Sequence, residues 1–403
     1  MANIAIMGFG TVGSGVYEIV KKNFAVLKQN ANGEEIKVKR ILDIRDFSSH
    51  EDASLFTKKF EDILNDDDIT VVVEVMGGLH PAYEFTKELL EHGKSVVTSN
   101  KELVATYGTE LLKLACDKNE NYLFEASVGG GIPVIRPIHQ CLTANRVERI
   151  AGILNGTTNY ILNEMIEKGK SFESALSDAQ SKGYAEKNPA ADIEGHDACR
   201  KIAILASLAS RKFVDYRNIV TEGIVDISLE DVKYAESCGK VIKLIGYAEF
   251  DENDKLFSIV CPMLVDKSSP LACVNGVYNA VMITGDSVGD VMFYGKGAGK
   301  LPTASAVVAD VIDAVKHIER SKKIAWTDIG SDFMVSEDEK CFPFFIRAKV
   351  KPDEAEKLFN VKEILNIGID GEFAFITDSI SGKEIKEKIK ELPEVISCIR
   401  VMQ

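Results

Sequence analysis

The first 125 residues alternate short apolar runs with amphipathic stretches. Buried strands are predicted at residues 2–7, 38–44, 71–75, 95–99 and 122–125. Between the first two, apolar side chains recur at helical spacing from Ser14 to Val26. Because parallel strands are joined by crossover helices, this alternation predicts an α/β domain built around a parallel sheet.

The pattern changes after residue 131. A helix is predicted at residues 134–142, followed by a strand at 149–154 and a helix at 160–168. Longer apolar runs follow at residues 219–227, 241–250, 256–265, 277–284 and 288–294. Gly285-Asp286-Ser287 separates the last two runs as a hairpin turn would. The middle of the chain is therefore expected to hold a mostly antiparallel sheet with helices.

The end of the chain suggests two further features. A glycine-rich loop at residues 295–299 precedes a small-residue helix, which we expect to return to the first domain. Residues 320–340 are polar and linker-like, and the tail that follows has a βαββαβ pattern. The predicted domains are residues 1–131 with 304–320, then 132–303, and finally 342–403.

Composition narrows the class of protein. The 403 residues carry a formal net charge of −14, which argues against nucleic acid or an anionic membrane as a partner. Apolar runs are shorter than a membrane span, and the N-terminus lacks the features of a signal peptide. The eight cysteines include no C-x-x-C pair, so neither a zinc site nor a disulfide framework is indicated. A reducing cytoplasm fits this use of cysteine best.

A glycine motif follows the first predicted strand. The run Gly8-Phe9-Gly10-Thr11-Val12-Gly13 matches G-x-G-x-x-G between a strand and a helix, which is the context of a dinucleotide site. The first glycine makes a tight turn, the second admits a pyrophosphate, and the third allows the helix to pack closely. These six residues are candidate cofactor contacts, and a merely glycine-rich turn is the alternative.

Charged residues follow two other strands of the predicted sheet. Asp43 would bind the ribose diol of NAD, whereas Arg45 would accommodate the 2′-phosphate of NADP. The choice of cofactor stays open at this point, and Arg45 favours NADP. Lys101 follows the fourth strand, where an open parallel sheet binds ligands, so it is a candidate contact to cofactor or substrate. A solvated lysine at a helix start is the alternative.

Residues 182–211 combine carboxylates and lysines on a predicted helix. Asp192 is expected to cap this helix, and Glu194, Asp197 and Lys201 then fall on one face. A solvated ion pair is the simplest interpretation of such a face. The density of acidic residues and glycines favours a functional site instead. A lysine beside carboxylates can donate or accept a proton when burial shifts its pKa.

Two loops carry further candidate ligands. Glu125 precedes three glycines at residues 129–131, a loop whose carbonyl oxygens suit either a crossing between domains or a hard cation. Thr157 and Thr158 precede the helix at 160–168. They could cap that helix, or they could hold a substrate carboxylate on its free N–H groups.

Seven motifs in order resemble the homoserine dehydrogenase family. They are GFGTVG, GGLHPAYEF, VVTSNKEL, EASVGGGIPVIRP, GILNGTTNYIL, GYAEKNPAADIEGHDACRK and GAGKLPTASAVVAD. The resemblance implies a Rossmann-like domain and an α/β catalytic domain that forms the dimer interface. It also implies interconversion of L-homoserine and L-aspartate 4-semialdehyde with NAD(P), in the pathway to threonine and methionine.

The same resemblance implies roles for individual residues. Lys201 would be the proton donor and acceptor at the reacting oxygen. The substrate would be bound by Glu186, Asp197, Asp192, Lys101, Tyr184, Gly156 and Thr157. Beyond the glycine motif and Arg45, the cofactor would be contacted by Met76, Lys101, Gly183 and Gly299. A monovalent cation, with sodium favoured, would be bound by Glu125, Val128, Gly130 and Ile132.

The resemblance also has implications for the C-terminal tail and for the oligomeric state. Residues 342–403 resemble an ACT domain, and a homodimer or homotetramer is implied. We expect this tail to be dispensable for homoserine oxidation, because every proposed catalytic group precedes residue 305. Two alternatives are a phosphorylating semialdehyde dehydrogenase, which needs a cysteine nucleophile, and a non-catalytic dinucleotide-binding sensor. The sensor would tolerate loss of Lys201 and Asp197, and both are present.

Overall fold

A computed structural model describes residues 1–318 and 320–403 of the chain. It divides into two compact units. The first unit comprises Met1–Ala144, Ala203–Asp215 and Gly295–Ile329. The second unit comprises Asn145–Ile202, Tyr216–Tyr294 and Gly330–Gln403. Among the described residues, no helix has both the length and the apolar character needed to cross a bilayer.

The first unit is built on a parallel sheet with strand order β3-β2-β1-β4-β5-β6. Its strands are β1 (Ala2–Met7), β2 (Ile36–Leu42), β3 (Phe56–Thr57), β4 (Ile69–Glu74), β5 (Ser95–Thr98) and β6 (Tyr122–Leu123). The inner strands are apolar at almost every position, because helices cover both faces of the sheet. The predicted Rossmann-like sheet is confirmed.

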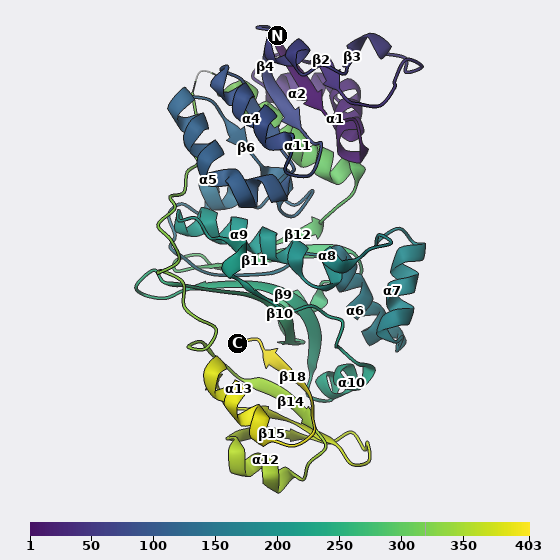
Figure 1. Cartoon of the computed structure of the whole chain (residues 1–403), viewed down its shortest axis with the longest axis vertical. Helices are drawn as coiled ribbons and strands as arrows, with labels where there is room; N and C mark the ends of the chain where they lie inside the picture. Colours follow the sequence, from purple (N-terminus) through teal and green to yellow (C-terminus); the bar gives the residue numbers. More distant parts are fainter. Residues whose placement is uncertain (319) are drawn as a thin grey trace. The chain divides into compact units, whose positions relative to one another are not determined.

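Helices lie on both sides of this sheet in Figure 1, with α4 and α5 on one side and α1 and α11 on the other. Their bounds are α1 (Thr11–Lys22), α2 (Phe24–Asn30), α3 (Glu61–Leu64), α4 (Ala82–Glu91), α5 (Lys101–Lys118) and α11 (Lys300–Lys316). A Cβ added at Gly15 of α1 would lie 2.9 Å from the Cβ of Ala304 of α11. The helix after the second glycine loop therefore returns to the first unit, as expected.

The second unit contains a ten-stranded sheet with order β12-β11-β7-β9-β10-β18-β14-β16-β15, and β8 pairs with β10. The strands before the tail are β7 (Val147–Ile153), β8 (Val220–Thr221), β9 (Lys240–Phe250), β10 (Leu256–Asp266), β11 (Tyr278–Gly285) and β12 (Gly289–Lys296). The helices are α6 (Gly156–Lys168), α7 (Phe172–Ser181), α8 (Ala190–Ile193), α9 (His196–Ser210) and α10 (Leu229–Ser237), and the second half of α9, from residue 203 on, belongs to the first unit. The predicted hairpin and the mostly antiparallel sheet are confirmed.

Two predicted elements differ from the structure. The helix predicted at 134–142 is a short π-helical segment, Pro137–Cys141. The strand predicted at 219–227 is limited to β8, because the chain leaves the sheet after Thr221. The backbone N–H of Ile224 then donates to the carbonyl of Ile193 at 2.9 Å. Apolar content alone does not distinguish a strand from an extended segment that packs against a helix turn.

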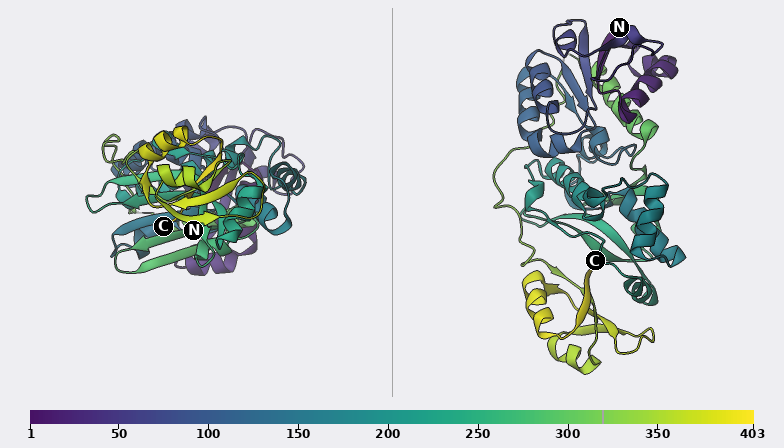
Figure 2. Two further views of the ribbon diagram at one scale, coloured as in Figure 1. Left: turned by 90° about the horizontal axis from the view of Figure 1, so that it is seen from below. Right: turned by 45° about the vertical axis from the view of Figure 1, so that its right-hand side comes forward.

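The tail has the predicted βαββαβ order. Its elements are β14 (Phe344–Ala348), α12 (Pro352–Leu358), β15 (Val361–Leu365), β16 (Phe373–Thr377), α13 (Gly382–Glu391) and β18 (Val395–Val401). A short pair, β13 (Cys341–Phe342) and β17 (Ile380–Ser381), lies beside them. Figure 2 shows both helices on one side of the tail strands. Strand β18 pairs antiparallel with β14 and parallel with β10, so the tail continues the sheet of the second unit.

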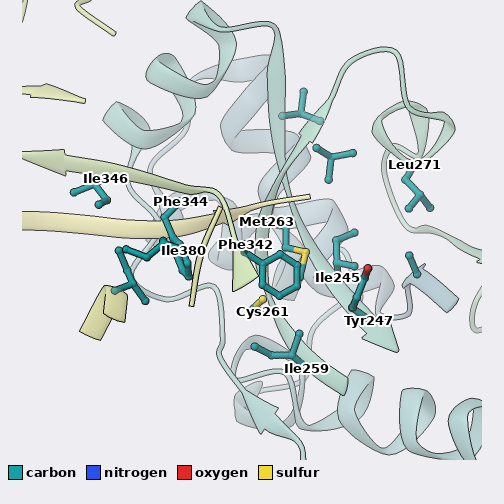
Figure 3. Packing of buried hydrophobic residues seen from close by; sticks show 14 of the residues in the cluster. Ile245, Tyr247, Ile259, Cys261, Met263, Leu271, Phe342, Phe344, Ile346 and Ile380 are labelled. Atoms are coloured by element: carbon teal, nitrogen blue, oxygen red, sulfur yellow. The ribbon is translucent and has the colours of Figure 1, made fainter. Parts of the chain in front are cut away.

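The tail also shares a hydrophobic core with that unit, as Figure 3 shows. The ring of Phe342 lies 5.9 Å from the ring of Tyr247 on β9 and 5.7 Å from that of Phe257 on β10. Removing the tail would expose both strands to water. The expectation that residues 342–403 are dispensable for homoserine oxidation stays a prediction, and the shared core weighs against it because the tail supplies one side of that core.

We predict that Phe342→Ala destabilises the second unit and not the tail alone. Truncating a buried phenylalanine costs about 3–5 kcal/mol through lost burial and the cavity left behind. Denaturant unfolding followed by far-UV circular dichroism measures this loss. Ile364→Ala is the matched control, since Ile364 lies on β15 and is 45% exposed. Equal stability of the two variants would show that Phe342 does not join the tail to the sheet.

Candidate active site

The glycine motif forms a tight connection between β1 and α1. Gly8 has φ +97°, and a Cβ added at Gly13 would lie 1.9 Å from the carbonyl oxygen of Gly8. Only glycine fits at these two positions. Gly10 has no other atom within 4 Å of its Cβ position, and no side chain caps the start of α1. The start of α1 therefore has no side-chain cap and has open space beside Gly10, which fits the pyrophosphate of a dinucleotide.

Asp43 and Arg45 form one ion pair beside this motif. The carboxylate of Asp43 accepts Nε and Nη2 of Arg45 at 2.9 and 2.7 Å, and the backbone N–H of Phe9 at 2.7 Å. The guanidinium of Arg45, through these hydrogen bonds, holds the pKa of Asp43 well below its usual range. Arg45 also lies over the ring of Phe47 at 5.1 Å. The charge of Asp43 is therefore neutralised, and the Arg45 side chain stays 56% exposed beside the glycine motif.

A buried carboxylate organises the ends of β4 and β5. Glu74 accepts the hydroxyl of Thr98 at 2.6 Å and the backbone N–H of Met76 at 2.9 Å. Burial raises the pKa of Glu74 above its ordinary value. The neighbouring Asn100 caps α5, so the network places both Met76 and Lys101 at the carboxyl edge of the sheet. The sequence analysis missed Glu74, although an acid that ends an otherwise apolar strand was a visible signal.

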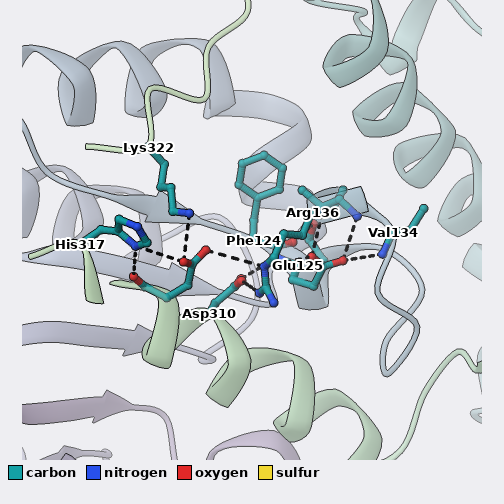
Figure 4. Close-up of polar contacts among 10 residues, drawn as sticks. Phe124, Glu125, Val134, Arg136, Asp310, His317 and Lys322 are labelled. Carbon is teal, nitrogen blue, oxygen red and sulfur yellow. Dashed lines mark hydrogen bonds and ion pairs between the residues drawn. The ribbon is translucent and has the colours of Figure 1, made fainter. Parts of the chain in front are cut away.

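Glu125 occupies a second buried network of the first unit, shown in Figure 4. Its carboxylate accepts the backbone N–H groups of Val134, Ile135 and Arg136 at 2.6, 2.8 and 2.8 Å. Its own backbone N–H donates to Asp310 at 2.7 Å. Burial, with the charge of Glu125, raises the pKa of Asp310 to about 7. The Glu125 side chain therefore caps a helical segment and is already saturated with donors.

The loop after Glu125 packs against the second glycine loop. Gly130 has φ +56°, and a Cβ added there would lie 2.3 Å from the carbonyl oxygen of Gly297. The N–H of Gly131 donates to the carbonyl of Lys296 at 3.1 Å. The predicted cation ligands Val128 and Ile132 are buried in this loop. The described residues include no cluster of three or more His, Cys, Asp or Glu arranged for a metal ion.

Lys201 and Asp197 form a buried ion pair on α9 of the second unit. The ammonium of Lys201 donates to Asp197 Oδ2 at 2.7 Å and to the carbonyl of Leu154 at 2.7 Å. Lys201 is 8% exposed and Asp197 is 7% exposed. An ammonium has three N–H donors, and these contacts use two of them. The alternative of a solvated ion pair is excluded by this burial.

Asn155 joins this pair to a second carboxylate. Its amide Nδ2 donates to Asp192 Oδ1 at 2.7 Å and to Asp197 Oδ2 at 2.8 Å. Its Oδ1 accepts the backbone N–H of Thr158 at 2.9 Å and caps α6. Burial raises the pKa of Asp192, the charge of Asp197 adds to this, and the hydrogen bond from Asn155 opposes it. The sequence analysis did not name Asn155 as a site residue, because its partners Asp192 and Asp197 lie 37 and 42 residues away along the chain.

Several predicted details of this region need correction. Asp192 lies inside the short helix α8 and does not cap the longer helix. Glu194 is exposed and pairs with His196, so it does not share the buried face of α9. Neither Thr157 nor Thr158 caps α6, because Asn155 does so. Local spacing predicted one continuous helix, whereas Gly195 interrupts it with φ +85°.

The remaining predicted substrate contacts lie close to this network. The hydroxyl of Thr157 donates to the backbone carbonyl of Tyr184 at 2.7 Å, which ties the start of α6 to the loop that carries Gly183. Tyr184 is 44% exposed, and Glu186 on the same loop is also exposed. The backbone carbonyl of Glu186 accepts a hydrogen bond from a glutamine at the end of α7. The second unit thus groups the predicted substrate residues other than Lys101.

Comparison with known proteins agrees with this geometry. The family profile "Homoserine dehydrogenase, NAD binding domain" matches residues 8–125, and the profile "Homoserine dehydrogenase" matches residues 133–312. The homoserine dehydrogenase of Neisseria gonorrhoeae is 37% identical over 98% of this chain and 96% of its own length. The chain belongs to the homoserine dehydrogenase family. Homoserine dehydrogenases are NAD(P)-dependent oxidoreductases, and the glycine turn described above is the part that fits the nicotinamide dinucleotide.

Solved homoserine dehydrogenases support the fold over the whole chain. The crystal structure of one from Thiobacillus denitrificans has a TM-score of 0.91 and 34% identity, and covers 100% of this chain and 98% of that chain. A hyperthermophilic archaeal homoserine dehydrogenase in complex with NADPH has a TM-score of 0.65 and 29% identity. It covers 78% of this chain and 97% of that chain. These relatives do not favour a non-catalytic sensor.

We predict that Asn155→Asp moves the acid limb of the pH dependence of kcat/KM for homoserine to higher pH. A third carboxylate in place of the amide would raise the pKa of Asp192 further, because like charges disfavour ionisation of each other. Initial rates across the pH range measure the shift. Asn155→Ser is the control, since it keeps an oxygen to cap α6 without adding a charge. An unmoved acid limb in the aspartate variant would remove Asn155 from the site.

Proposed function

We propose that this homoserine dehydrogenase interconverts L-homoserine and L-aspartate 4-semialdehyde with a preference for NADP, in the pathway to threonine and methionine. The observation that carries the site assignment is the network of Lys201, Asp197, Asn155 and Asp192. It combines a buried proton-transfer group with one buried and one partly buried carboxylate. That combination matches a substrate with an alcohol and an ammonium group.

Each residue of the network has a proposed role. Asp197 and Asp192 would bind the ammonium of homoserine, since buried carboxylates need positive partners. The N–H groups of Gly156 and Thr157, at the start of a thirteen-residue helix, would bind its carboxylate. Glu186 and Tyr184 would line the pocket from the loop that follows α7. Lys201 would remove the hydroxyl proton in oxidation and return it in reduction.

The cofactor supplies the hydride chemistry when it is bound. Gly8, Phe9, Gly10, Thr11, Val12 and Gly13 would hold its pyrophosphate, with further contacts from Met76, Lys101, Gly183 and Gly299. In reduction, charge develops on the substrate oxygen, and the ammonium of Lys201 would stabilise it before giving up a proton. Asp197 would keep this ammonium in place, as their hydrogen bond of 2.7 Å indicates.

The preference for NADP rests on Arg45. In the ion pair with Asp43, the guanidinium cancels the acid that would otherwise repel a 2′-phosphate. Arg45 is held above Phe47 and keeps more than half of its side chain exposed. The NADPH complex of the archaeal relative is consistent with this preference.

A monovalent cation, preferably sodium, is proposed at the loop that follows Glu125. Because the carboxylate of Glu125 already accepts three backbone N–H groups, the ligands would be main-chain oxygens of Glu125, Val128, Gly130 and Ile132. Hard cations bind such oxygens. Equal activity in sodium, potassium and a large organic cation at matched ionic strength would contradict this part of the proposal.

A homodimer or homotetramer with an ACT-like tail is the proposed assembly. The βαββαβ order and the strand order β18-β14-β16-β15 support the likeness of the tail to an ACT domain. Light scattering of the purified protein tests the assembly, and a monomer at micromolar concentration would contradict it. The predicted domain boundaries and the cytoplasmic location stay predictions.

We predict that Lys201→Met lowers kcat for homoserine oxidation by about 10²–10⁴-fold, the usual contribution of a positioned acid–base group. Methionine keeps most of the buried volume, so the change removes the proton-transfer group with little repacking. Steady-state kinetics at saturating homoserine measure it. Lys94→Met is the matched control, because Lys94 is only 3% exposed but lies in the first unit, bonded to the carbonyls of Asp66 and Ile69. Near-normal kcat in Lys201→Met would refute the assignment.

We predict that Arg45→Ala raises KM for NADP by about tenfold or more, since a hydrogen bond to a charged group contributes about 1.5–3 kcal/mol. KM for NAD should change little, because NAD lacks the 2′-phosphate. Both constants are measured at saturating homoserine in the same preparation, so NAD serves as the internal control. An equal relative change in KM for NADP and for NAD would show that Arg45 does not bind the 2′-phosphate.

A further inference from the structure

Arg400 on the last strand is held in one orientation by three groups. Its Nη1 donates to both carboxylate oxygens of Glu222 at 2.8 and 2.9 Å, and its Nη2 donates to Glu337. The guanidinium also lies 5.5 Å from the centre of the Phe344 ring. The Arg400 side chain is 7% exposed, whereas that of Glu222 is 42% exposed. A planar guanidinium that donates in two directions fixes the plane of its partners as well as their distance.

The segment that carries Glu222 packs closely against the turn between α8 and α9. The backbone N–H of Glu222 donates to the carbonyl of Val260 on β10 at 2.7 Å. Two residues later, the N–H of Ile224 donates to the carbonyl of Ile193 at 2.9 Å. A Cβ added at Gly223 would lie only 2.3 Å from that same carbonyl oxygen. The segment therefore sets where Ile193 can lie.

That turn separates the two carboxylates of the proposed substrate site. Asp192 ends up on α8 and Asp197 on α9, with Gly195 between them at φ +85°. A Cβ added at Gly195 would lie 3.0 Å from Cγ2 of Thr221, so the same segment also touches the turn here. A shift of residues 221–224 would change the distance between the two carboxylates that Asn155 bridges.

We propose that Arg400 is a positioning residue for homoserine binding. Through Glu222 it fixes residues 221–224, and through them the turn that spaces Asp192 and Asp197. The inference rests on the proposed function, because it assumes that these carboxylates bind the substrate ammonium. It gives the tail a role in substrate affinity that needs no ligand bound to the tail.

The test compares Arg400→Met with Arg347→Met in steady-state kinetics of the full-length enzyme. Arg347 is the matched control, because it is also a buried arginine of the tail, on β14, but pairs with Asp231 of α10 instead of Glu222. In Arg400→Met, KM for homoserine should rise by at least about fivefold, the lower end of couplings between separate sites. KM for the cofactor should not change, and Arg400→Lys should recover part of the loss because it keeps the charge.

The outcomes separate this inference from the proposed site. Asp197→Asn is measured in parallel, and an unchanged homoserine KM in that variant would mean that the proposed site itself is wrong. If Asp197→Asn raises this KM but Arg400→Met leaves it unchanged, only the role of Arg400 is refuted. An equal rise in Arg347→Met would refute it too, since general loosening of the tail would then explain both.

Glu222→Gln guards against failure of Arg400→Met to fold. The side chain of Glu222 is partly exposed, so this variant removes the negative charge of the pair at a position that tolerates it. The buried guanidinium of Arg400 keeps its ion pair with Glu337. The same rise in homoserine KM is expected, with a circular dichroism spectrum like that of the unmodified enzyme. An unchanged homoserine KM in Glu222→Gln would overturn the proposal even if Arg400→Met cannot be purified.

Discussion

Two carboxylates held close together, one buried and one partly buried, are the constraint on which the proposed substrate site depends. Asp192 and Asp197 repel each other, and burial removes the water that would weaken the repulsion. An amide and an ammonium offset this repulsion, since Asn155 donates hydrogen bonds to both carboxylates and Lys201 donates one to Asp197. Because the same Asn155 caps α6, the start of that helix is locked to the acids. The proposed site for the substrate ammonium would therefore be formed before the substrate binds.

Much of the first unit was predictable, because its chemistry is local in the sequence. The glycine motif, Asp43 and Arg45 follow directly after strands whose apolar runs are easy to recognise, and parallel neighbours bring those strand ends together. The structure added pairing that local spacing cannot express. It showed that Asp43 and Arg45 form an ion pair. It also showed that the carboxylate of Glu125 accepts backbone N–H groups at the start of a helical segment.

The second unit was less predictable for the same physical reason. Asp197 and Lys201 share a helix face, so their pairing followed from a spacing of four residues. Asn155 lies 42 residues from Asp197, and Arg400 lies 178 residues from Glu222. No periodicity connects residues so far apart, and only the folded sheet brings them together. The expectation for the tail rested on the proposed catalytic groups, which all precede residue 305, and it did not foresee that Phe342 packs against rings of β9 and β10.

This difference in locality has a consequence for the enzyme. The glycine turn of the dinucleotide site is made by one strand, one turn and one helix, although that helix also packs against the distant α11 at Gly15. The proposed homoserine site depends on the turn between α8 and α9. That turn contacts residues 221–224, which pair with β10, and β10 pairs in turn with the last strand of the chain. If Arg400 positions this turn as proposed, affinity for homoserine would vary with the packing of the tail while affinity for the nicotinamide cofactor would not. On that proposal, the tail would set substrate affinity through the core that it shares with β9 and β10 and through the contact of Arg400 with Glu222.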